Sequence, residues 1–477
     1  MSIDVPGKAA ARQKWIAGVA LALAMPAVIG ERLLPGAWFA IPAALAVLVA
    51  VVALLPSLGW QRRIFVAIGA ALAVIAAATR DDWWAMLADG LASSAFIAAF
   101  FTAQACLRSA AVRSPAIEAC GRYIADQPPG RRYAALTIGA QGFGLVLAYG
   151  SLSLLGSLAE TSARGEADPE RRRHRRRRML LAIQRGFVST LPWSPLGFLV
   201  AITTAKVPGA SWEAMVLPGI VSALILAGSG WALDTVFKPR LSSPAPPPPV
   251  HDEPWHEATR PLLILLAVMA VLVGGIALTL GVSAPIAVMI VVPPIALGWV
   301  GLQHSRPLSP GGAGAMLGWL RRYLGQELPG YGGEITLLAM AGLIGTLGGQ
   351  LAQPWLAGSG IGLEGLPGAL VLLGLMWMVP IAGQVGMNPI LAVALAAPLL
   401  PDAASFGASA TAVAVAIACG WSLSGITSPF TATTLIVGSL GKVSATHVGL
   451  RWNGPYTLVT GLLLSGWTLA VHAMTMP

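Results

Sequence analysis

Two short segments place hydroxyl side chains beside a Ser-Pro pair inside long apolar runs. Residues 182–195 read AIQRGFVSTLPWSP, and residues 416–429 read AIACGWSLSGITSP. Proline removes a backbone donor and clashes with the preceding helical turn, so each segment is expected to interrupt a helix. The freed backbone groups, or a bound solute, can be satisfied by the hydroxyls. The side chains concerned are Ser189, Thr190, Ser194, Ser422, Ser424, Thr427 and Ser428, next to Pro195 and Pro429.

The two segments form an internal repeat. They align without a gap, and the matches that carry weight are Gly186 with Gly420, Phe187 with Trp421 and the two Ser-Pro pairs. Matched alanines and isoleucines carry little weight, because small apolar residues often coincide in apolar chains. The competing interpretation is a pair of proline-kinked helices whose hydroxyls bond back to their own carbonyls. Two copies of the motif favour a pair of broken helices that together bind a solute.

Amide side chains stand between glycines in two further apolar runs. Residues 139–144 read GAQGFG, and residues 383–389 read GQVGMNP. An amide without a partner is costly in hydrocarbon, so these side chains should face a partner, water or a ligand. Capping of a helix at a hairpin tip is the alternative, and it is compatible with binding. The candidate residues are Gln141, Gly142, Gly144, Gln384, Gly386, Asn388 and Pro389, and a sodium ion is expected near Asn388 and Ser428.

Two charged residues inside apolar runs are further candidates. Arg185 lies one turn before the first expected break and can attract an anion. It also lies seven residues after Arg178, so extension of its side chain to the interface is an equal alternative. Asp89 is the only acidic residue well inside a run and could carry a proton, although exposure to water near the interface is the favoured interpretation.

The composition identifies the class of protein that must position these residues. The chain has 477 residues, of which 10% are charged and 56% are hydrophobic even before its 55 glycines are counted. Soluble domains carry about 25% charged residues, so a polytopic, all-α membrane protein is expected. The three cysteines, Cys106, Cys120 and Cys419, show no paired or metal-ligand spacing.

The apolar runs predict eleven crossings and two hairpins that enter the membrane and return on the same side. The crossings are 15–30, 37–59, 64–79, 83–107, 179–205, 212–237, 261–280, 284–302, 335–352, 404–440 and 456–473, and the hairpins are 133–158 and 366–400. The first crossing has basic residues before it but no small-residue cleavage site after it, so we interpret it as an uncleaved helix rather than a signal peptide.

Basic residues set the expected orientation, because Lys and Arg concentrate on the cytoplasmic side. With the N-terminus inside and the C-terminus outside, all but four of the 30 Lys and Arg residues lie inside. Arg32, Arg80 and Lys206 lie outside, and Arg185 lies at membrane depth. The two broken helices then run in opposite directions, as in transporters with inverted repeats. We expect an integral protein of a bacterial inner (cytoplasmic) membrane.

A stiff spacer is expected to divide the chain into two halves. Residues 238–260 contain the proline run 246–249, which favours an extended conformation. The halves are 1–237 and 261–477. Each is expected to hold scaffold helices (15–107 and 261–352), then a hairpin, a broken helix and a final helix.

The arrangement resembles the ion transporter superfamily, whose best-described members are the divalent anion:sodium symporters. Residues 428–444, SPFTATTLIVGSLGKVS, resemble the family's unwound helix, and residues 386–401, GMNPILAVALAAPLLP, resemble its second hairpin tip. The family's Ser-Asn-Thr signature is absent from both hairpins. The resemblance implies an elevator mechanism, in which the hairpins, the broken helices and the spans 212–237 and 456–473 move against a scaffold that forms a homodimer.

These features predict that the protein is a secondary active transporter and not an enzyme. The expected solute is a small organic anion of the carboxylate type. Helix N-termini at the breaks and tips would bind the anion, and Na⁺ or H⁺ would be the coupling ion, with no other cofactor. A channel or a lipid-handling protein on the same fold is the alternative. No cluster of acids, bases or metal ligands at one depth supports a membrane-embedded enzyme.

Two other motifs have simpler explanations. The basic run from Arg171 to Arg178 is expected to contact membrane lipid headgroups rather than nucleic acid. The glycines Gly345, Gly348 and Gly349 are expected to allow close helix packing, because no strand precedes them as a dinucleotide-binding motif would require.

Overall fold

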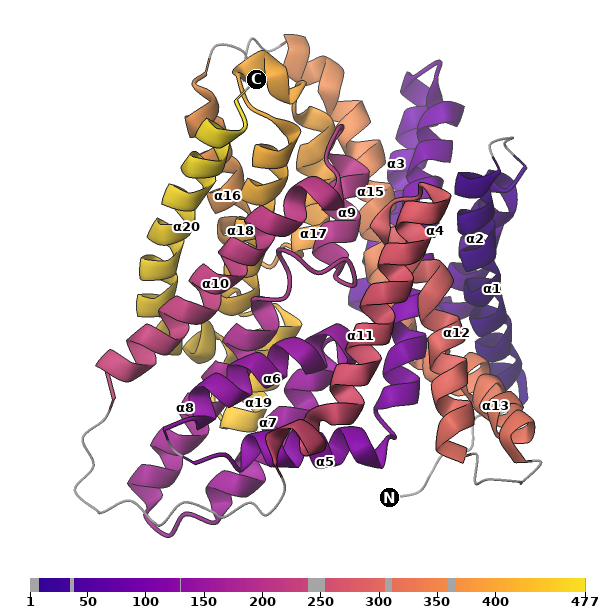
Figure 1. Cartoon of the computed structure of the whole chain (residues 1–477). Coiled ribbons are helices and arrows are strands. Elements are labelled where there is room, and N and C mark those ends of the chain that lie inside the picture. The colour runs from indigo at the N-terminus through magenta and orange to yellow at the C-terminus, as the bar shows by residue number, and fades with distance from the viewer. Residues whose placement is uncertain are drawn as a thin grey trace. The chain divides into compact units, whose positions relative to one another are not determined.

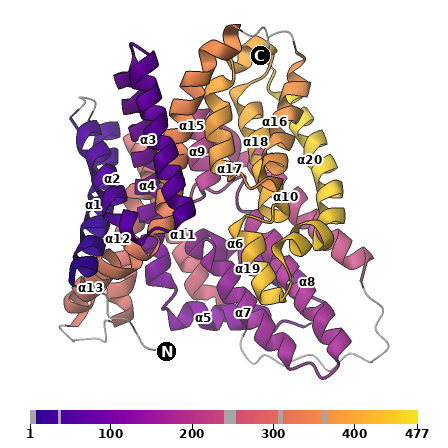
Figure 2. The same cartoon turned by 180° about the vertical axis from the view of Figure 1, so that it is seen from behind.

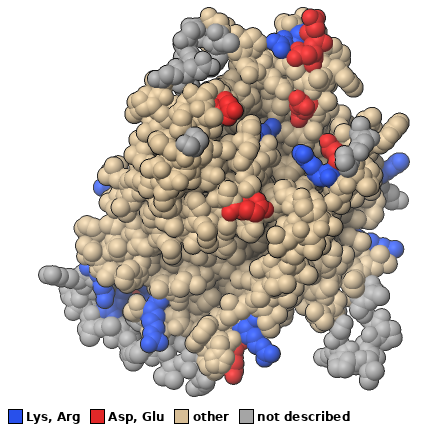
Figure 3. Space-filling view, turned by 45° about the horizontal axis from the view of Figure 1, so that its top comes forward, with Lys and Arg blue, Asp and Glu red and all other residues tan. Residues whose placement is uncertain are grey.

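The computed structural model describes residues 8–34, 38–128, 130–238, 254–304, 311–358 and 366–476, and within these ranges every regular element is a helix. The predicted all-α polytopic fold class is therefore confirmed. Ten helical segments of the described ranges are long and apolar enough to span a membrane. Charged side chains are sparse on the face shown in Figure 3, as expected where a protein surface meets lipid.

The ten spans match ten of the eleven predicted crossings. The eleventh, 179–205, is divided between two helices. The first, α8 (Pro169–Val188), starts earlier than predicted and includes the arginine run, and the second, α9 (Phe198–Lys206), has only nine residues. One helix is too basic and the other too short to count as a span, whereas the crossing 404–440, which is also divided between two helices, is apolar throughout and counts as one.

The packing of the helices divides the chain into two units, called unit 1 and unit 2 below. Unit 1 comprises residues 1–111, 271–362 and 390–400, and unit 2 comprises residues 112–270, 363–389 and 401–477. Each unit takes segments from both sequence halves, so the units do not coincide with those halves. The proline run 246–249 lies outside the described residues, and α11 (Trp255–Leu280) begins within the predicted spacer and contributes to both units.

Unit 1 is built around α4 (Trp83–Ala111), which packs against α1, α2, α12 and α15. Polar groups tie these helices together: the Ser94 hydroxyl donates to the Ala339 carbonyl at 2.6 Å, and Tyr323 donates to the Thr102 carbonyl at 2.6 Å. The other helical segments of unit 1 are α1 (Lys8–Leu33), α2 (Ala40–Leu54), η1 (Leu55–Ser57), α3 (Trp60–Thr79), α12 (Ala284–His304), α13 (Gly311–Arg322), η2 (Tyr323–Glu327), α14 (Leu328–Gly330), α15 (Gly332–Gly358), α17 (Pro389–Ala396) and η3 (Ala397–Leu399).

The predicted role of the α15 glycines is confirmed. A Cβ at Gly345 would collide with Ala394 of α17, one at Gly349 would collide with Pro398, and one at Gly348 would lie 3.2 Å from Leu395. The absence of side chains at these three positions lets α17 and η3 approach the backbone of α15 closely.

Unit 2 is built around α18 (Ala410–Thr427), in which residues 412–427 are all buried. Figures 1 and 2 show α16, α18 and α20 side by side, and α8, α9 and α10 also pack against α18. The helical segments besides α8, α9, α11 and α18 are α5 (Pro115–Ala125), α6 (Arg132–Leu147), α7 (Gly150–Arg164), α10 (Trp212–Val236), α16 (Gly368–Gln384), η4 (Ala403–Phe406), α19 (Ala432–Gly441), η5 (His447–Trp452) and α20 (Gly454–Met474).

The first predicted hairpin, 133–158, is formed by α6 and α7, but its turn is not at the glutamine. The chain reverses at Ala148, which has a φ of 47°, and at Tyr149, whereas residues 139–144 lie inside α6. The glycines there serve packing rather than a turn: a Cβ at Gly139 would lie 2.8 Å from Ile124, and one at Gly142 would lie 3.3 Å from Leu262 of α11.

The second predicted hairpin, 366–400, has its tip where the sequence indicates. Helix α16 ends at Gln384, Gly386 takes a φ of 90°, and α17 starts at Pro389. The two limbs belong to different units, however, because α16 packs against α18 and α20 whereas residues 390–400 group with α15.

Candidate solute-binding site

The first broken helix opens between α8 and α9. Helix α8 ends at Val188, and residues 189–197 form turns before α9 begins at Phe198. The Ser194 hydroxyl accepts a hydrogen bond from the Leu196 amide at 3.2 Å, so the serine closes a turn directly around Pro195. The Ser-Pro pair therefore shapes the turn that leads the chain into α9.

The second broken helix opens between α18 and α19. Ser428 is extended, with φ −66° and ψ 125°, and its hydroxyl accepts from the Phe430 amide at 3.2 Å while donating to the Gly383 carbonyl at 2.6 Å. The Ser428 carbonyl in turn accepts from the hydroxyls of Thr431 and Thr434. Side-chain hydroxyls thus satisfy the backbone groups that the break frees around Pro429.

Equivalent residues of the two repeat copies make equivalent contacts. Ser194 and Ser428 each accept from the amide two residues later, at the same 3.2 Å. A Cβ at Gly186 would collide with the Thr137 carbonyl of α6, and one at Gly420 would collide with the Met376 carbonyl of α16. A helix therefore packs closely against the glycine that precedes each break: α6 against Gly186 and α16 against Gly420.

The broken helices run in opposite directions. Helix α9 packs against α18, and α19 packs against α8. Figures 1 and 2 place α8 and α19 toward one end of unit 2 and α9 toward the other. The breaks lie side by side, because a Cβ at Gly425 would lie 3.4 Å from Val188 and 3.8 Å from Leu191.

Most of the predicted hydroxyls are already engaged. Ser189 donates to the Gly186 carbonyl at 2.7 Å, Thr190 donates to the Phe187 carbonyl at 2.7 Å, and Thr427 donates to the Leu423 carbonyl at 2.8 Å. These three behave as in the competing interpretation of kinked helices, although both helices are interrupted. Their oxygens can still accept, and Ser189 accepts from the Gln141 amide at 2.9 Å.

Ser424 is different from the other hydroxyls. It is fully buried, and its oxygen has no hydrogen-bond partner among the residues that the structure describes. A Cβ at Gly383 would lie 2.5 Å from that oxygen, so only glycine at this position of α16 leaves room for the Ser424 hydroxyl. A buried hydroxyl without a partner is costly, so Ser424 is the side chain best placed to donate to a solute.

The hairpin candidates fall into two groups. Gln141 bonds Ser189, and a Cβ at Gly144 would lie 3.5 Å from Thr190, so both face the first break, whereas Gly142 faces α11. At the second tip, Gly386 lies near Phe430, since a Cβ there would be 3.8 Å from its ring. Gln384 and Asn388 are half-buried residues that flank this tip, and Pro389 begins α17.

Arg185 sits in a buried polar cluster. Its Nε donates to the Asn453 amide oxygen at 3.1 Å, its Nη1 donates to the Tyr133 hydroxyl at 3.2 Å, and its guanidinium lies 4.2 Å from the centre of the Tyr456 ring. Asn453 also donates to Gln184 at 3.0 Å. The Arg185 guanidinium is therefore buried among side chains of unit 2 and does not extend to an interface. It makes no ion pair within the described part of the chain.

Sequence reasoning missed these partners of Arg185. Asn453 is one of only two asparagines in the chain, and that rarity was the available signal. Asp89 lies in unit 1, where it is exposed and accepts from Gln350 at 3.1 Å, so it is not among the unit 2 candidates. Clusters of three or more His, Cys, Asp or Glu side chains that could hold a metal are absent from the described ranges.

Comparisons with known proteins identify the fold. No protein-family profile matches the chain, and no curated protein sequence matches it. Solved structures do match, among them two that the alignment covers over most of their own length. The YdaH transporter of Alcanivorax borkumensis has a TM-score of 0.55 and 14% identity, over 88% of this chain and 99% of that one. MtrF of Neisseria gonorrhoeae, described with a class of antimetabolite efflux pumps, has a TM-score of 0.54 and 14% identity, over 86% and 94%.

Both proteins are transporters, but neither is described as a divalent anion:sodium symporter, so the comparisons do not support the family resemblance inferred from the sequence. At 14% identity, the likeness to both proteins is one of fold. Unit 2 contains the two helix breaks and the buried guanidinium of Arg185. It also contains the buried hydroxyl of Ser424, which has no partner within the described residues. The chain therefore has the fold of a polytopic membrane transporter.

Proposed function

We propose that the protein is a secondary active transporter for a small organic anion of the carboxylate type. The observation that carries this proposal is that two oppositely directed helix breaks meet at Gly425, next to Ser424, whose buried hydroxyl has no partner within the described residues. Transporters with inverted repeats bind their solutes at such discontinuous helices, near the middle of the membrane.

The charge of the site favours an anion. Helices α9 and α19 each begin at a break, and neither Gly197 nor Thr431 caps its helix with a side chain, so both N-termini present amides and the positive end of the helix dipole. The buried guanidinium of Arg185, one turn before Ser189, adds a full positive charge. A solute carboxylate would compensate both.

A cation gradient is the proposed energy source. Helices α8 and α18 end at the breaks, and exposed carbonyls at such ends can hold Na⁺ without a carboxylate. Na⁺ near Asn388 and Ser428, or H⁺, is the proposed coupling ion. In the proposed elevator mechanism unit 2 carries the solute, unit 1 is the scaffold and two copies form a dimer. The proposed setting is a bacterial inner membrane, with the N-terminus inside.

Uptake into proteoliposomes tests the function. We expect at least one carboxylate from a panel of benzoate, succinate and glutamate to accumulate above its external concentration when a Na⁺ or pH gradient is applied. We also expect it to exchange in counterflow without a gradient. Flux that only equalises concentrations and shows no counterflow would indicate a channel instead. Transport confined to neutral or cationic solutes would contradict the anionic assignment.

A further inference from the structure

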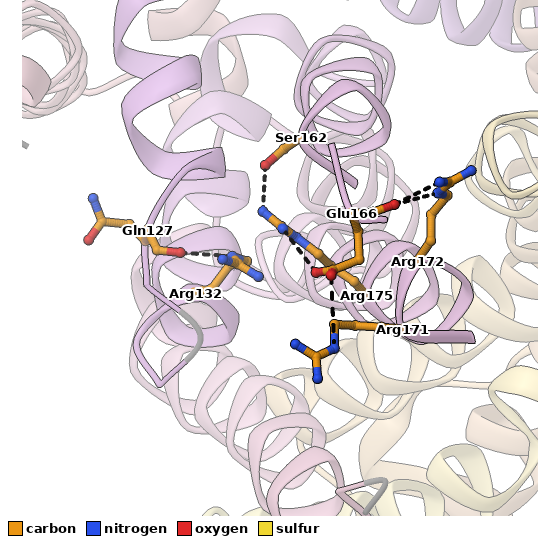
Figure 4. Close-up of polar contacts among 7 residues, drawn as sticks. All are labelled: Gln127, Arg132, Ser162, Glu166, Arg171, Arg172 and Arg175. Atoms are coloured by element: carbon orange, nitrogen blue, oxygen red, sulfur yellow. Dashed lines mark hydrogen bonds and ion pairs between the residues drawn. The ribbon is translucent and has the colours of Figure 1, made fainter. Parts of the chain in front are cut away.

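The arginine-rich start of α8 carries seven arginines within eight residues, and most of them are engaged. Figure 4 shows Arg171 and Arg175 facing the Glu166 carboxylate at 3.9 and 3.7 Å, and Arg172 donating twice to the Glu166 carbonyl at 3.0 and 2.7 Å. Arg178 pairs with Asp234 at 2.6 Å. The positive charge here exceeds the negative charge that the surrounding side chains supply.

The local excess of charge is visible in Arg132, which also appears in Figure 4. Burial, together with the positive charge of Arg175, lowers the pKa of the Arg132 guanidinium to about 10, even though its Nε donates to the Gln127 carbonyl at 2.7 Å. Burial is the larger cause of this lowered pKa, and the contribution of Arg175 shows that positive charges are crowded here, which favours a bound anion.

Arg176 stands out within the run. It is half-buried and makes no hydrogen bond or ion pair with another described residue. It lines a pocket of about 290 Å³ together with Glu160, Ala163, Arg164, Arg172 and Lys442. Glu160, the one acid of this pocket, is paired with Arg164 at 3.0 Å. Arg172, Arg176 and Lys442 therefore present uncompensated positive charge to the pocket.

A second pocket of about 340 Å³ shares Arg176 and has an apolar wall formed by Val443 and Trp452. Arg177 lies over the Trp452 ring at 5.8 Å. Beneath this wall, Leu180 of α8 packs with Val437 of α19 in an apolar cluster. The two pockets are thus lined by basic side chains and, on one side, by the apolar side chains of Val443 and Trp452. The apolar cluster beneath them connects α8 with α19.

We propose that Arg172, Arg176 and Lys442 bind a phosphate group between α8 and the end of α19. Guanidinium groups form paired, charge-assisted hydrogen bonds to phosphate oxygens. With a volume of about 290 Å³, the pocket lies just below the usual ligand-site range of about 300 to 1,000 Å³, so it fits a headgroup or a small phosphate rather than a large ligand. The apolar wall next to it suits the glycerol and acyl part of an anionic phospholipid.

The position of Lys442 gives this site a consequence for the broken helices. Lys442 is the residue after α19 and takes a φ of 57°, a left-handed conformation that ends the helix. Helix α8 leads into the first break, and α19 leads away from the second. A phosphate held by Arg176 and Lys442 would therefore tie the two broken helices together at one end of unit 2.

The test compares a pocket variant with a charge-matched control. The pocket variant is Arg176→Gln with Lys442→Gln, and the control is Arg122→Gln with Arg451→Gln, two exposed arginines of unit 2 that line neither pocket. Delipidated protein is titrated with phosphatidylglycerol and, separately, phosphatidylcholine, with retained lipid counted by native mass spectrometry. A parallel titration uses inorganic phosphate at constant ionic strength, with the thermal midpoint as readout.

We expect the pocket variant to bind at least about tenfold more weakly than the wild type and the control, because it loses two charge-assisted contacts. Retention of phosphatidylglycerol without a response to inorganic phosphate would identify a lipid headgroup, and a response to inorganic phosphate would identify a soluble phosphate. Both outcomes support the site. Equal binding of both probes by the wild type and the pocket variant, or equal weakening in the control, would overturn it. Lys442→Gln alone, at an exposed position, replaces the double variant if that does not fold.

Discussion

Replacing Ser424 by alanine is expected to lower transport by about 10- to 100-fold and to leave the stability of the protein unchanged or slightly higher. The hydroxyl is buried and has no partner within the described residues, so its removal breaks no hydrogen bond of the fold. A hydrogen bond from that hydroxyl to an anionic solute contributes about 1.5 to 3 kcal/mol, which corresponds to the expected loss. Initial uptake rates and thermal midpoints measure the two effects.

Ser422→Ala is the matched control for this experiment. Ser422 is equally buried and lies two residues earlier in α18, but its hydroxyl donates to the Ala418 carbonyl at 2.8 Å. We expect this variant to lose a little stability and to keep its transport. Wild-type transport in Ser424→Ala, or a loss of transport that only follows a loss of folded protein, would remove Ser424 from the site.

Gly420→Ala is expected to lower the free energy of unfolding by about 1 to 3 kcal/mol and to impair transport. A Cβ at this position would collide with the Met376 carbonyl, a backbone atom that cannot move without displacing α16. Gly186→Ala should behave in the same way against the Thr137 carbonyl of α6. The loss exceeds the gain in helix propensity, because alanine is favoured over glycine by only about 1 kcal/mol.

Gly466→Ala in α20 is the control, since no atom would lie within 4 Å of its new Cβ. Here only the helix propensity changes, so this variant should be more stable than the wild type. The sign of the effect therefore distinguishes close packing from a general response to alanine. If Gly420→Ala and Gly186→Ala were as stable as Gly466→Ala, the two helix contacts in front of the breaks would be wrongly assigned.

The sequence predicts the broken helices well because the physical signal is local. Hydropathy and length define the spans, and a Ser-Pro pair in an apolar run removes a backbone donor where no water can replace it. The breaks after Val188 and Thr427 and the second tip at Gly386 follow from such signals. The repeat is detectable in the sequence because the same residue types are needed in both copies. The glycines allow close helix packing, and the serines accept a hydrogen bond from the backbone at the break.

The remaining features depend on contacts that hydropathy does not encode. In the sequence, glycines around Gln141 are as consistent with a turn as with close packing. The structure shows close packing, because Ile124 and Leu262 lie next to these glycines. The partners of Arg185 come from α6 and from residues around α20, far away in sequence. The assignment of α17 to unit 1 similarly rests on the fit of Ala394 against Gly345, which periodicity does not reveal.

Thiol modification at position 424 tests the central claim most directly. Ser424→Cys and the control Ser222→Cys are made in a chain whose three native cysteines, all buried, are replaced by alanine. Both serines are fully buried, but Ser222 bonds the Pro218 carbonyl of its own helix at 3.0 Å. Reconstituted protein is treated with a small, hydrophilic methanethiosulfonate, with and without the carboxylate found in the uptake assay.

If the two breaks enclose a solute site that opens to water during transport, the thiol at position 424 reacts and the carboxylate slows its reaction by at least about tenfold. The thiol at position 222 stays unreactive in both conditions. Equal reaction rates at the two positions, with no protection of position 424 by the solute, would contradict the account.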